Sequence, residues 1–284
     1  MVLSQTVQGQ IPYYFKHYEV EHGLTNNTVL SSMQDKKGFM WFGTIDGLNR
    51  FDGYSFKTFR NDPADAKSLG SNAIYSLYQT ADEMIWIGTN KGLYKYNPVG
   101  ESFELLSSTA NQRVKSIMVD DKGTLWFISN YVLCNYTIKT KSLRTFPSRS
   151  YEPTSICADK YGNIWVATST GFLKKYNPAN NTFSSFDLFP DLENNCSRHI
   201  EKIYNTNKGT ILVGTLNKGI KLFDTKTGTV KDIIIYNHDK TGIFVKDFMQ
   251  SSENEYWAAT ENGLYIYDLE QEKFIKLKMQ YNNS

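Results

Sequence analysis

The chain has 284 residues, enough for one large all-β domain or two domains of ordinary size. Its 31 basic and 29 acidic residues nearly cancel, so the composition gives no electrostatic footprint for nucleic acid or an anionic membrane. No apolar stretch reaches the roughly 18–20 residues needed to cross a bilayer. Aromatic residues make up 14% of the chain, which suits many short, half-buried strands.

Residues 1–13 are expected to be an extended or disordered segment. They lack the basic and apolar runs of a signal peptide, so two interpretations stay open: a cytosolic protein, or one whose leader has been removed. The following Tyr14-Phe15-Lys16-His17-Tyr18 copies Ser55-Phe56-Lys57-Thr58-Phe59. Residues 15–18 are therefore predicted to form an extra outer strand.

From residue 29 onward, one pattern of four short strands recurs six times. In the second copy, Ile74–Tyr78 alternates in polarity, Ile85–Thr89 is apolar on both faces, and Leu93–Tyr96 and Phe103–Leu106 follow. Hairpins join these segments, as in one blade of a β-propeller. We therefore predict an all-β propeller over residues 14–277 with a tail at 278–284, and with repeats near 29–59, 74–106, 114–146, 154–186, 200–233 and 245–277.

The second strand of each repeat is centred on a bulky apolar residue, which is tryptophan in five repeats and Leu212 in the fifth. We expect the tryptophans to act as wedges between neighbouring blades. The turn before this strand often has aspartate three residues ahead of glycine, as in Asp35–Gly38 and Asp120–Gly123. A carboxylate that caps backbone N–H groups explains this spacing, so neither a metal nor a cofactor is expected.

The six repeats already have their own outer strands, which leaves the one at 15–18 without a blade. An outer strand at the N-terminus normally completes the last blade of a ring and hides its edges. We therefore expect the six repeats to be part of a seven-bladed ring. The alternative is a ring closed at six blades. An open edge would invite pairing with another chain, so a homodimer is also expected.

Two repeats carry a family resemblance. The runs Trp41-Phe42-Gly43-Thr44 before Asp46-Gly47-Leu48, and Trp86-Ile87-Gly88-Thr89 before Gly92-Leu93, resemble the two-component regulator propeller repeat. The segment around His22-Gly23-Leu24-Thr25 is similar to the start of sensor regions in bacterial hybrid two-component systems. Repeat three, which has lost both glycines, and repeat five, which lacks tryptophan, depart from the pattern.

The resemblance implies a periplasmic input region of a membrane-spanning regulator that senses glycan fragments. Such a regulator has two seven-bladed propellers, a further β-domain, a transmembrane helix and a histidine kinase core. None of the four histidines lies in a kinase phospho-acceptor context, so this stretch would be only the front of the input module, and its partners would be the remaining blades and domains.

In a propeller, the loops leading into the first strands share a face with the hairpins between second and third strands. That face is the default binding surface. Asparagine, arginine and tyrosine side chains there could hold sugar hydroxyls or carboxylates. The candidate ligand-binding residues are Arg113, Tyr131, Arg198, His199, Asn72, Asn90, Lys91 and Asp46.

Three function classes follow. The first is a non-catalytic sensory propeller that binds an oligosaccharide. The second is a protein-interaction scaffold without a small ligand. The third is a propeller lyase or glycosidase, for which Asp46 and Glu261 would have to come within about 5–10 Å of each other. With no catalytic set in the sequence, we expect no enzymatic activity.

Overall fold

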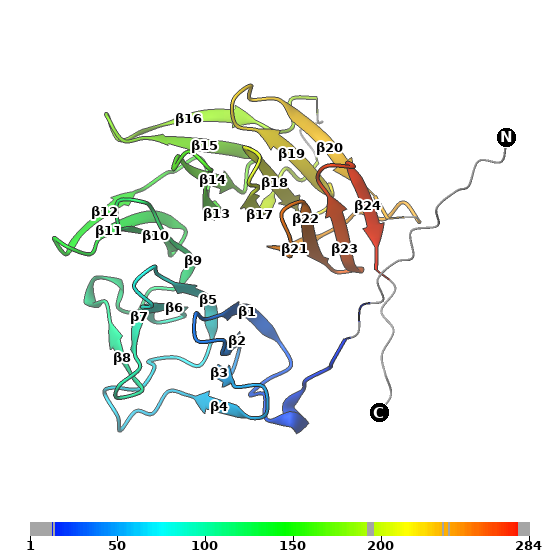
Figure 1. The fold of residues 1–284 in the computed structure, drawn as a ribbon. Helices are drawn as coiled ribbons and strands as arrows, with labels where there is room; N and C mark the ends of the chain where they lie inside the picture. Colours follow the sequence, from blue (N-terminus) through cyan, green and yellow to red (C-terminus); the bar gives the residue numbers. More distant parts are fainter. Residues whose placement is uncertain (1–12, 14, 192–195, 235, 238, 278–284) are drawn as a thin grey trace.

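The computed structural model describes residues 13, 15–191, 196–234, 236–237 and 239–277. Six four-stranded antiparallel sheets are arranged around an axis as the blades of a propeller (Figure 1). The predicted all-β propeller fold is confirmed. The segment expected at 1–13, apart from Tyr13, and the tail expected at 278–284 lie outside the described residues.

Each blade takes four consecutive strands in chain order. Blade one is β1 (Val29–Gln34), β2 (Met40–Thr44), β3 (Gly47–Phe51) and β4 (Phe56–Phe59), and blade two is β5 (Ile74–Gln79), β6 (Ile85–Thr89), β7 (Gly92–Asn97) and β8 (Ser102–Leu105). Blade three is β9 (Val114–Val119), β10 (Thr124–Ser129), β11 (Val132–Thr137) and β12 (Ser142–Phe146), and blade four is β13 (Pro153–Ala158), β14 (Ile164–Thr168), β15 (Phe172–Asn177) and β16 (Thr182–Asp187). Blade five is β17 (Ile200–Asn205), β18 (Thr210–Thr215), β19 (Ile220–Asp224) and β20 (Val230–Ile234), and blade six is β21 (Val245–Gln250), β22 (Glu255–Thr260), β23 (Gly263–Asp268) and β24 (Lys273–Lys276). Two short 3-10 helices, η1 (Val20–His22) and η2 (Ser107–Thr109), complete the described elements.

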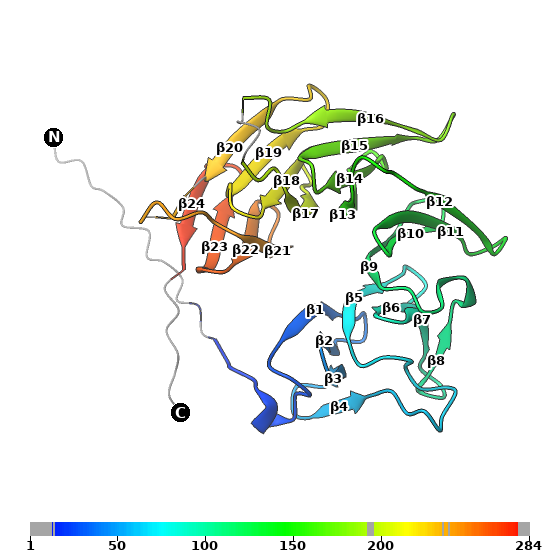
Figure 2. The ribbon, with the colours of Figure 1, turned by 180° about the vertical axis from the view of Figure 1, so that it is seen from behind.

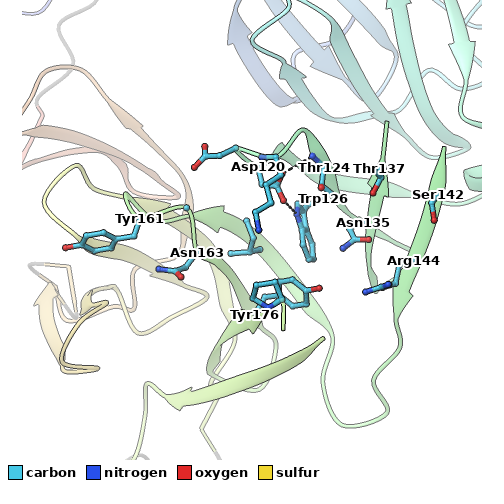
Figure 3. Close-up of a pocket in the computed structure, with 15 residues that line it drawn as sticks. Asp120, Thr124, Trp126, Asn135, Thr137, Ser142, Arg144, Tyr161, Asn163 and Tyr176 are labelled. Carbon is cyan, nitrogen blue, oxygen red and sulfur yellow. Dashed lines mark hydrogen bonds between the residues drawn. The ribbon is translucent and has the colours of Figure 1, made fainter. Parts of the chain in front are cut away.

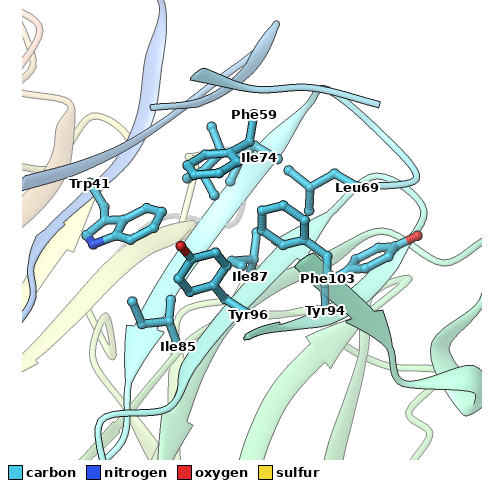
Figure 4. Close-up of a cluster of buried hydrophobic side chains, with 10 residues drawn as sticks. Trp41, Phe59, Leu69, Ile74, Ile85, Ile87, Tyr94, Tyr96 and Phe103 are labelled. Atoms are coloured by element: carbon cyan, nitrogen blue, oxygen red, sulfur yellow. The ribbon is translucent and has the colours of Figure 1, made fainter. Parts of the chain in front are cut away.

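The tryptophans of the first four blades are wedges, as predicted. Trp41 is 1% exposed and packs among Ile74, Ile85 and Tyr96 of blade two (Figure 4). Buried clusters in the same way join Trp86 to blade three, Trp126 to blade four, Trp165 to blade five and Leu212 to blade six. Burial of these side chains between sheets contributes to holding consecutive blades together.

The aspartate turns have the capping geometry expected from the sequence. Oδ1 of Asp35 accepts hydrogen bonds from the backbone N–H groups of Lys37, at 3.0 Å, and Phe39, at 2.9 Å. Gly38 takes a φ of 90°, a conformation that glycine adopts without steric cost. Asp120 and Asp159 cap their turns with the same pairs of backbone bonds.

Within the extra outer strand predicted at residues 15–18, Phe15 makes a β-bridge and residues 16–18 lie in no strand. The aromatic rings of this segment pack on side chains of two blades. The centroids of Tyr13 and Phe15 lie 4.9 Å and 6.4 Å from that of Trp257, on blade six. Tyr18, further along, lies 4.9 Å from Phe51 on blade one. The segment therefore crosses from blade six to blade one (Figure 2).

Consecutive blades contact each other through their first strands, from β1 and β5 to β17 and β21. Within the described residues, blades one and six make no comparable contact, and Figures 1 and 2 both show them apart. The expectation of a seven-bladed ring stays a prediction. Among the same residues, no helix has the length and apolarity to cross a bilayer.

Candidate functional site

The first strands lie innermost around the axis, and the loops that lead into them meet the hairpins between second and third strands (Figure 1). Blade three shows how these two segments are joined. The backbone N–H of Arg113 donates to the Asn130 side chain at 2.9 Å, and the Asn130 N–H donates to the Arg113 carbonyl at 3.0 Å. This pairing fixes Arg113 beside the hairpin residue Tyr131.

Arg113 lies between two tyrosine rings. Its guanidinium carbon is 4.8 Å from the centroid of Tyr131 and 5.6 Å from that of Tyr75, on β5 of the neighbouring blade. Tyr131 has a φ of 65°, a strained backbone conformation for this residue in the hairpin. Its side chain is 48% exposed, so the ring is accessible to a ligand from solvent. The predicted pair Arg113 and Tyr131 is thus brought together, and Tyr75 joins it.

Charged residues of the first strands continue this site toward the axis. Lys115 is close enough to Glu201, on β17, that each charge affects the pKa of the other group. Burial lowers the pKa of Lys115, whereas Glu201 opposes that shift. We call Tyr75, Arg113, Lys115, Tyr131 and Glu201 the axial cluster.

His199 belongs to the edge of this cluster. Its Nε2 lies 3.1 Å from Oε2 of Glu201, and this hydrogen bond is the main cause that lowers the pKa of the Glu201 carboxyl. Lys246 of β21 also lowers that pKa and pairs with Glu261 at 3.3 Å. Blades three, five and six therefore contribute alternating charges to one region.

Asp46 and Asn72 also meet, but they serve the loop between blades one and two. The Asn72 amide donates to Oδ1 of Asp46 at 3.1 Å, and Arg60 donates to Oδ2 at 2.9 Å. Backbone atoms of Asn90 and Lys91 close the next hairpin, to Ala73 and Thr89 respectively. No hydrogen bond or ion pair among the described residues joins these four candidates to the axial cluster.

Arg198 is held by protein groups of blade four. It forms an ion pair with Asp187, and its guanidinium lies 5.7 Å from the ring of Phe172 and 6.0 Å from that of Phe189. Its side chain is 23% exposed. The arrangement anchors the loop before β17, which leaves Arg198 less available for a ligand than Arg113.

The residues missed in the sequence share one structural position. In five blades the register of the first strand shifts around its second residue, which is Leu30, Tyr75, Thr154, Glu201 or Lys246. A β-bulge of this kind re-aims a side chain and does not disturb the apolar alternation from which strands are read. Polar residues recur at this second position in every repeat except the first, and this recurrence was the signal that could have identified them.

The carboxylates considered for a glycosidase are both engaged. Asp46 is paired with Arg60 at 2.9 Å, and Glu261 is paired with Lys246 at 3.3 Å. No group of three or more histidine, cysteine, aspartate or glutamate side chains in the described chain could hold a metal ion. The axial cluster instead offers a guanidinium, two aromatic rings, a lysine and a carboxylate, a set suited to binding a polar organic ligand.

Comparison with known proteins gives the same family that the repeats resemble. The two-component regulator propeller family matches residues 23–46, 68–91 and 147–170, which overlap repeats one, two and four. The chain is 46% identical to histidine kinase P4 of Formosa agariphila over a stretch of 57 residues. This stretch is 20% of the present chain and 4% of that protein.

Among solved structures, the chain is similar to the extracellular domain of a putative hybrid two-component system from B. thetaiotaomicron. The TM-score is 0.78 at 28% identity, over 96% of this chain and 38% of that one. A virginiamycin B lyase from Staphylococcus aureus has a TM-score of 0.70 over 90% of this chain and 85% of its own, and its 10% identity shows a shared fold alone.

The chain spans only a part of the two-component proteins that it matches. The family model matches the two repeats that carry the resemblance and also repeat four, and the blade arrangement is similar to that of an extracellular domain of such a system. This chain therefore carries two-component regulator propeller repeats.

Proposed function

We propose that this chain is a non-catalytic sensory propeller in the periplasmic part of a two-component regulator, and that it responds to glycan fragments. Its similarity to an extracellular domain at 28% identity over 96% of its length is the observation that supports this most directly. In this proposal the rest of the same regulator supplies the membrane-spanning and kinase parts and relays the signal.

The axial cluster is the proposed ligand contact. The ring of Tyr131, 48% exposed, offers a face for the C–H groups of a sugar, and the guanidinium 4.8 Å away offers donors to its hydroxyl or carboxylate oxygens. Because Tyr75 flanks the guanidinium on its other side, Arg113 is oriented before any ligand arrives.

A thermal-shift screen against short oligosaccharides of starch, xylan, pectin and alginate tests the proposal. A ligand of the folded state stabilises it by about 2.7 kcal/mol at a hundredfold excess over its Kd. The Arg113→Ala/Tyr131→Ala variant should lose the shift, whereas Arg149→Ala, at an exposed arginine between blades three and four, should retain it.

A shift that survives in Arg113→Ala/Tyr131→Ala would exclude the axial cluster as the contact. Absence of any shift, together with capture of a second protein chain, would favour the interaction scaffold. Turnover of an oligosaccharide in the same panel would overturn the non-catalytic assignment and support the lyase or glycosidase alternative.

A further inference from the structure

Blade three has a regular grid of side chains on the face that meets blade four. Across β10, β11 and β12, one row pairs Thr124 with Thr137 and Ser142. The next row pairs Trp126 with Asn135 and Arg144. Paired residues and residues two apart point to the same side of a sheet, so all six side chains share one face.

A cavity of about 430 Å³ lies over this grid (Figure 3). It is near the Asp120 turn, at the start of β10, whereas the axial cluster lies beyond the other end of that strand. Its far wall is the turn and outer part of blade four, with Tyr161, Asn163 and Tyr176. We call this cavity the blade-three groove.

Two substitutions in the repeat account for the size of the groove. Two residues before the wedge tryptophan, blade one has Phe39 and blade two has Met84, but blade three has the smaller Thr124. Opposite the wedge, Trp41 pairs with Arg50 and Trp86 pairs with Lys95, but Trp126 pairs with the shorter Asn135.

Blade one shows what the longer side chains do at these positions. The guanidinium of Arg50 lies 4.9 Å from the ring of Phe39, and its Nη1 donates to the hydroxyl of Tyr96 on the next blade at 3.2 Å. The groove between blades one and two is correspondingly smaller, at about 310 Å³. In blade three the space that these atoms fill is left open.

The polar groups of the blade-three groove are available to a ligand. The side chains of Thr124, Asn135, Thr137 and Ser142 have no hydrogen-bond partner among the described residues. Asp120, in contrast, uses both carboxylate oxygens, in its turn and on the Trp126 indole at 2.9 Å. Three hydroxyls and one amide therefore face a cavity large enough for a small ligand.

The charges around the groove indicate an uncharged ligand. Lys122 and Arg144 balance Asp120 and Asp121, and Arg144 is bonded to the Asn181 side chain. Hydroxyl and amide groups both donate and accept, which matches the hydroxyls of a sugar, and tyrosine rings pack against its C–H faces.

We propose that the blade-three groove binds one neutral saccharide unit, independently of the axial cluster. The grid of Thr124, Asn135, Thr137 and Ser142 supplies the hydrogen bonds, and Tyr161 and Tyr176 bound the ligand on the blade-four side.

The test uses saturation-transfer NMR in the Arg113→Ala/Tyr131→Ala background, so that binding at the axial cluster does not contribute. The probes are the methyl glycosides of glucose, galactose, mannose and xylose, with glucuronate as the charged comparison. The groove is filled by Thr124→Met/Asn135→Lys, which introduces the side chains that blade two carries at the same positions. Because blade two folds with these residues, the fourfold variant should fold, as circular dichroism and its Tm will show.

Saturation transfer to at least one neutral glycoside, and its loss when the groove is filled, is the expected result. Equal transfer in both proteins, no transfer to any neutral glycoside, or transfer to glucuronate alone would each overturn the proposal. Failure here leaves the proposed function unaffected, because that rests on oligosaccharide binding by the intact axial cluster.

Discussion

Trp165 donates its indole N–H to Oδ2 of Asp159 at 2.8 Å, so the wedge of blade four is bonded to the turn six residues before it. The other oxygen of the same carboxylate accepts the backbone N–H groups of Tyr161 and Asn163. The relationship recurs between Trp41 and Asp35, at 2.8 Å, and between Trp126 and Asp120, at 2.9 Å. One aspartate thus fixes both the turn and the orientation of the wedge.

Replacing Asp159 with alanine should destabilise the protein by about 2–3 kcal/mol, since it leaves a buried indole N–H unpaired and uncaps the turn. Asp159→Asn should lose less, because the amide oxygen can still accept one of these bonds. Urea unfolding at neutral pH measures both. A value for Asp159→Ala within about 0.5 kcal/mol of the parent would show that the bond does not stabilise the fold.

Blade two lacks this aspartate, which leads to a stabilising substitution. Thr80 stands six residues before Trp86, and the Trp86 indole nitrogen is buried without a partner among the described residues. The Thr80 hydroxyl donates to the Asp82 carboxylate, so the substitution is made together with Asp82→Lys to avoid two adjacent carboxylates. Thr80→Asp/Asp82→Lys should supply the acceptor and raise the free energy of unfolding by about 1 kcal/mol.

The matched control is Thr206→Asp, six residues before Leu212, where no indole can donate. Because Thr206 is fully buried, a carboxylate there should destabilise the protein. If both variants change stability in the same direction, the aspartate acts through the turn alone.

Tyr267 is 1% exposed, and its hydroxyl has no partner within the described chain. Burial raises its pKa to about 12. Tyr267→Phe removes an unsatisfied polar group and should stabilise the protein by about 1 kcal/mol at neutral pH.

The raised pKa of Tyr267 also determines how the free energy of unfolding depends on pH. The folded state favours the neutral Tyr267 hydroxyl. The stability that depends on this neutral form is therefore fully present below the ordinary tyrosine pKa of about 10, and it is lost as the pH rises through the raised pKa of the folded state. Urea unfolding at pH 7 and pH 11 should therefore show a smaller alkaline loss for Tyr267→Phe. An equal loss in both proteins would contradict the assignment.

Trp257 differs from the other tryptophans because its neighbours are Tyr13 and Phe15 instead of a following blade. Tyr13→Ala/Phe15→Ala should shift the Trp257 fluorescence to the red and destabilise blade six by about 1–3 kcal/mol, from two aromatic contacts. Tyr54→Ala, at a residue 96% exposed, is the control. Unchanged emission, measured with and without Trp257→Phe, would show that these rings do not cover the indole.

Much of the fold could be predicted from the sequence, because the apolar pattern of each repeat marks its four strands. Five of the six repeats also have tryptophan in the middle of the second strand. The contact of Arg113 with Tyr131 could also be predicted, since the loop before a first strand and the hairpin after the second strand lie on the same face of a propeller. Tyr75 and Glu201 were not found, because a bulge re-aims them without changing the apolar alternation, and only the recurrence of polar residues at this strand position marks them.

The outer strand predicted at residues 15–18, where only Phe15 makes a β-bridge, shows where a sequence pattern stops being informative. Its side-chain pattern copies a true outer strand, but backbone pairing also needs a free neighbouring edge, and no residue of the segment states whether one is present. The ion pair of Arg198 with Asp187 was not visible in the sequence either, because it depends on how the segment between β16 and β17 folds back on itself.

The separation between blades one and six affects how this molecule comes apart. A closed ring must break two blade–blade interfaces to release any blade, whereas among the described residues the first and last blades each have one such interface and share only the segment that carries Tyr13, Phe15 and Tyr18. Unfolding is then favoured to start at these two blades and move inward, so amide hydrogens of β2 and β22 should exchange sooner than those of β10 and β14.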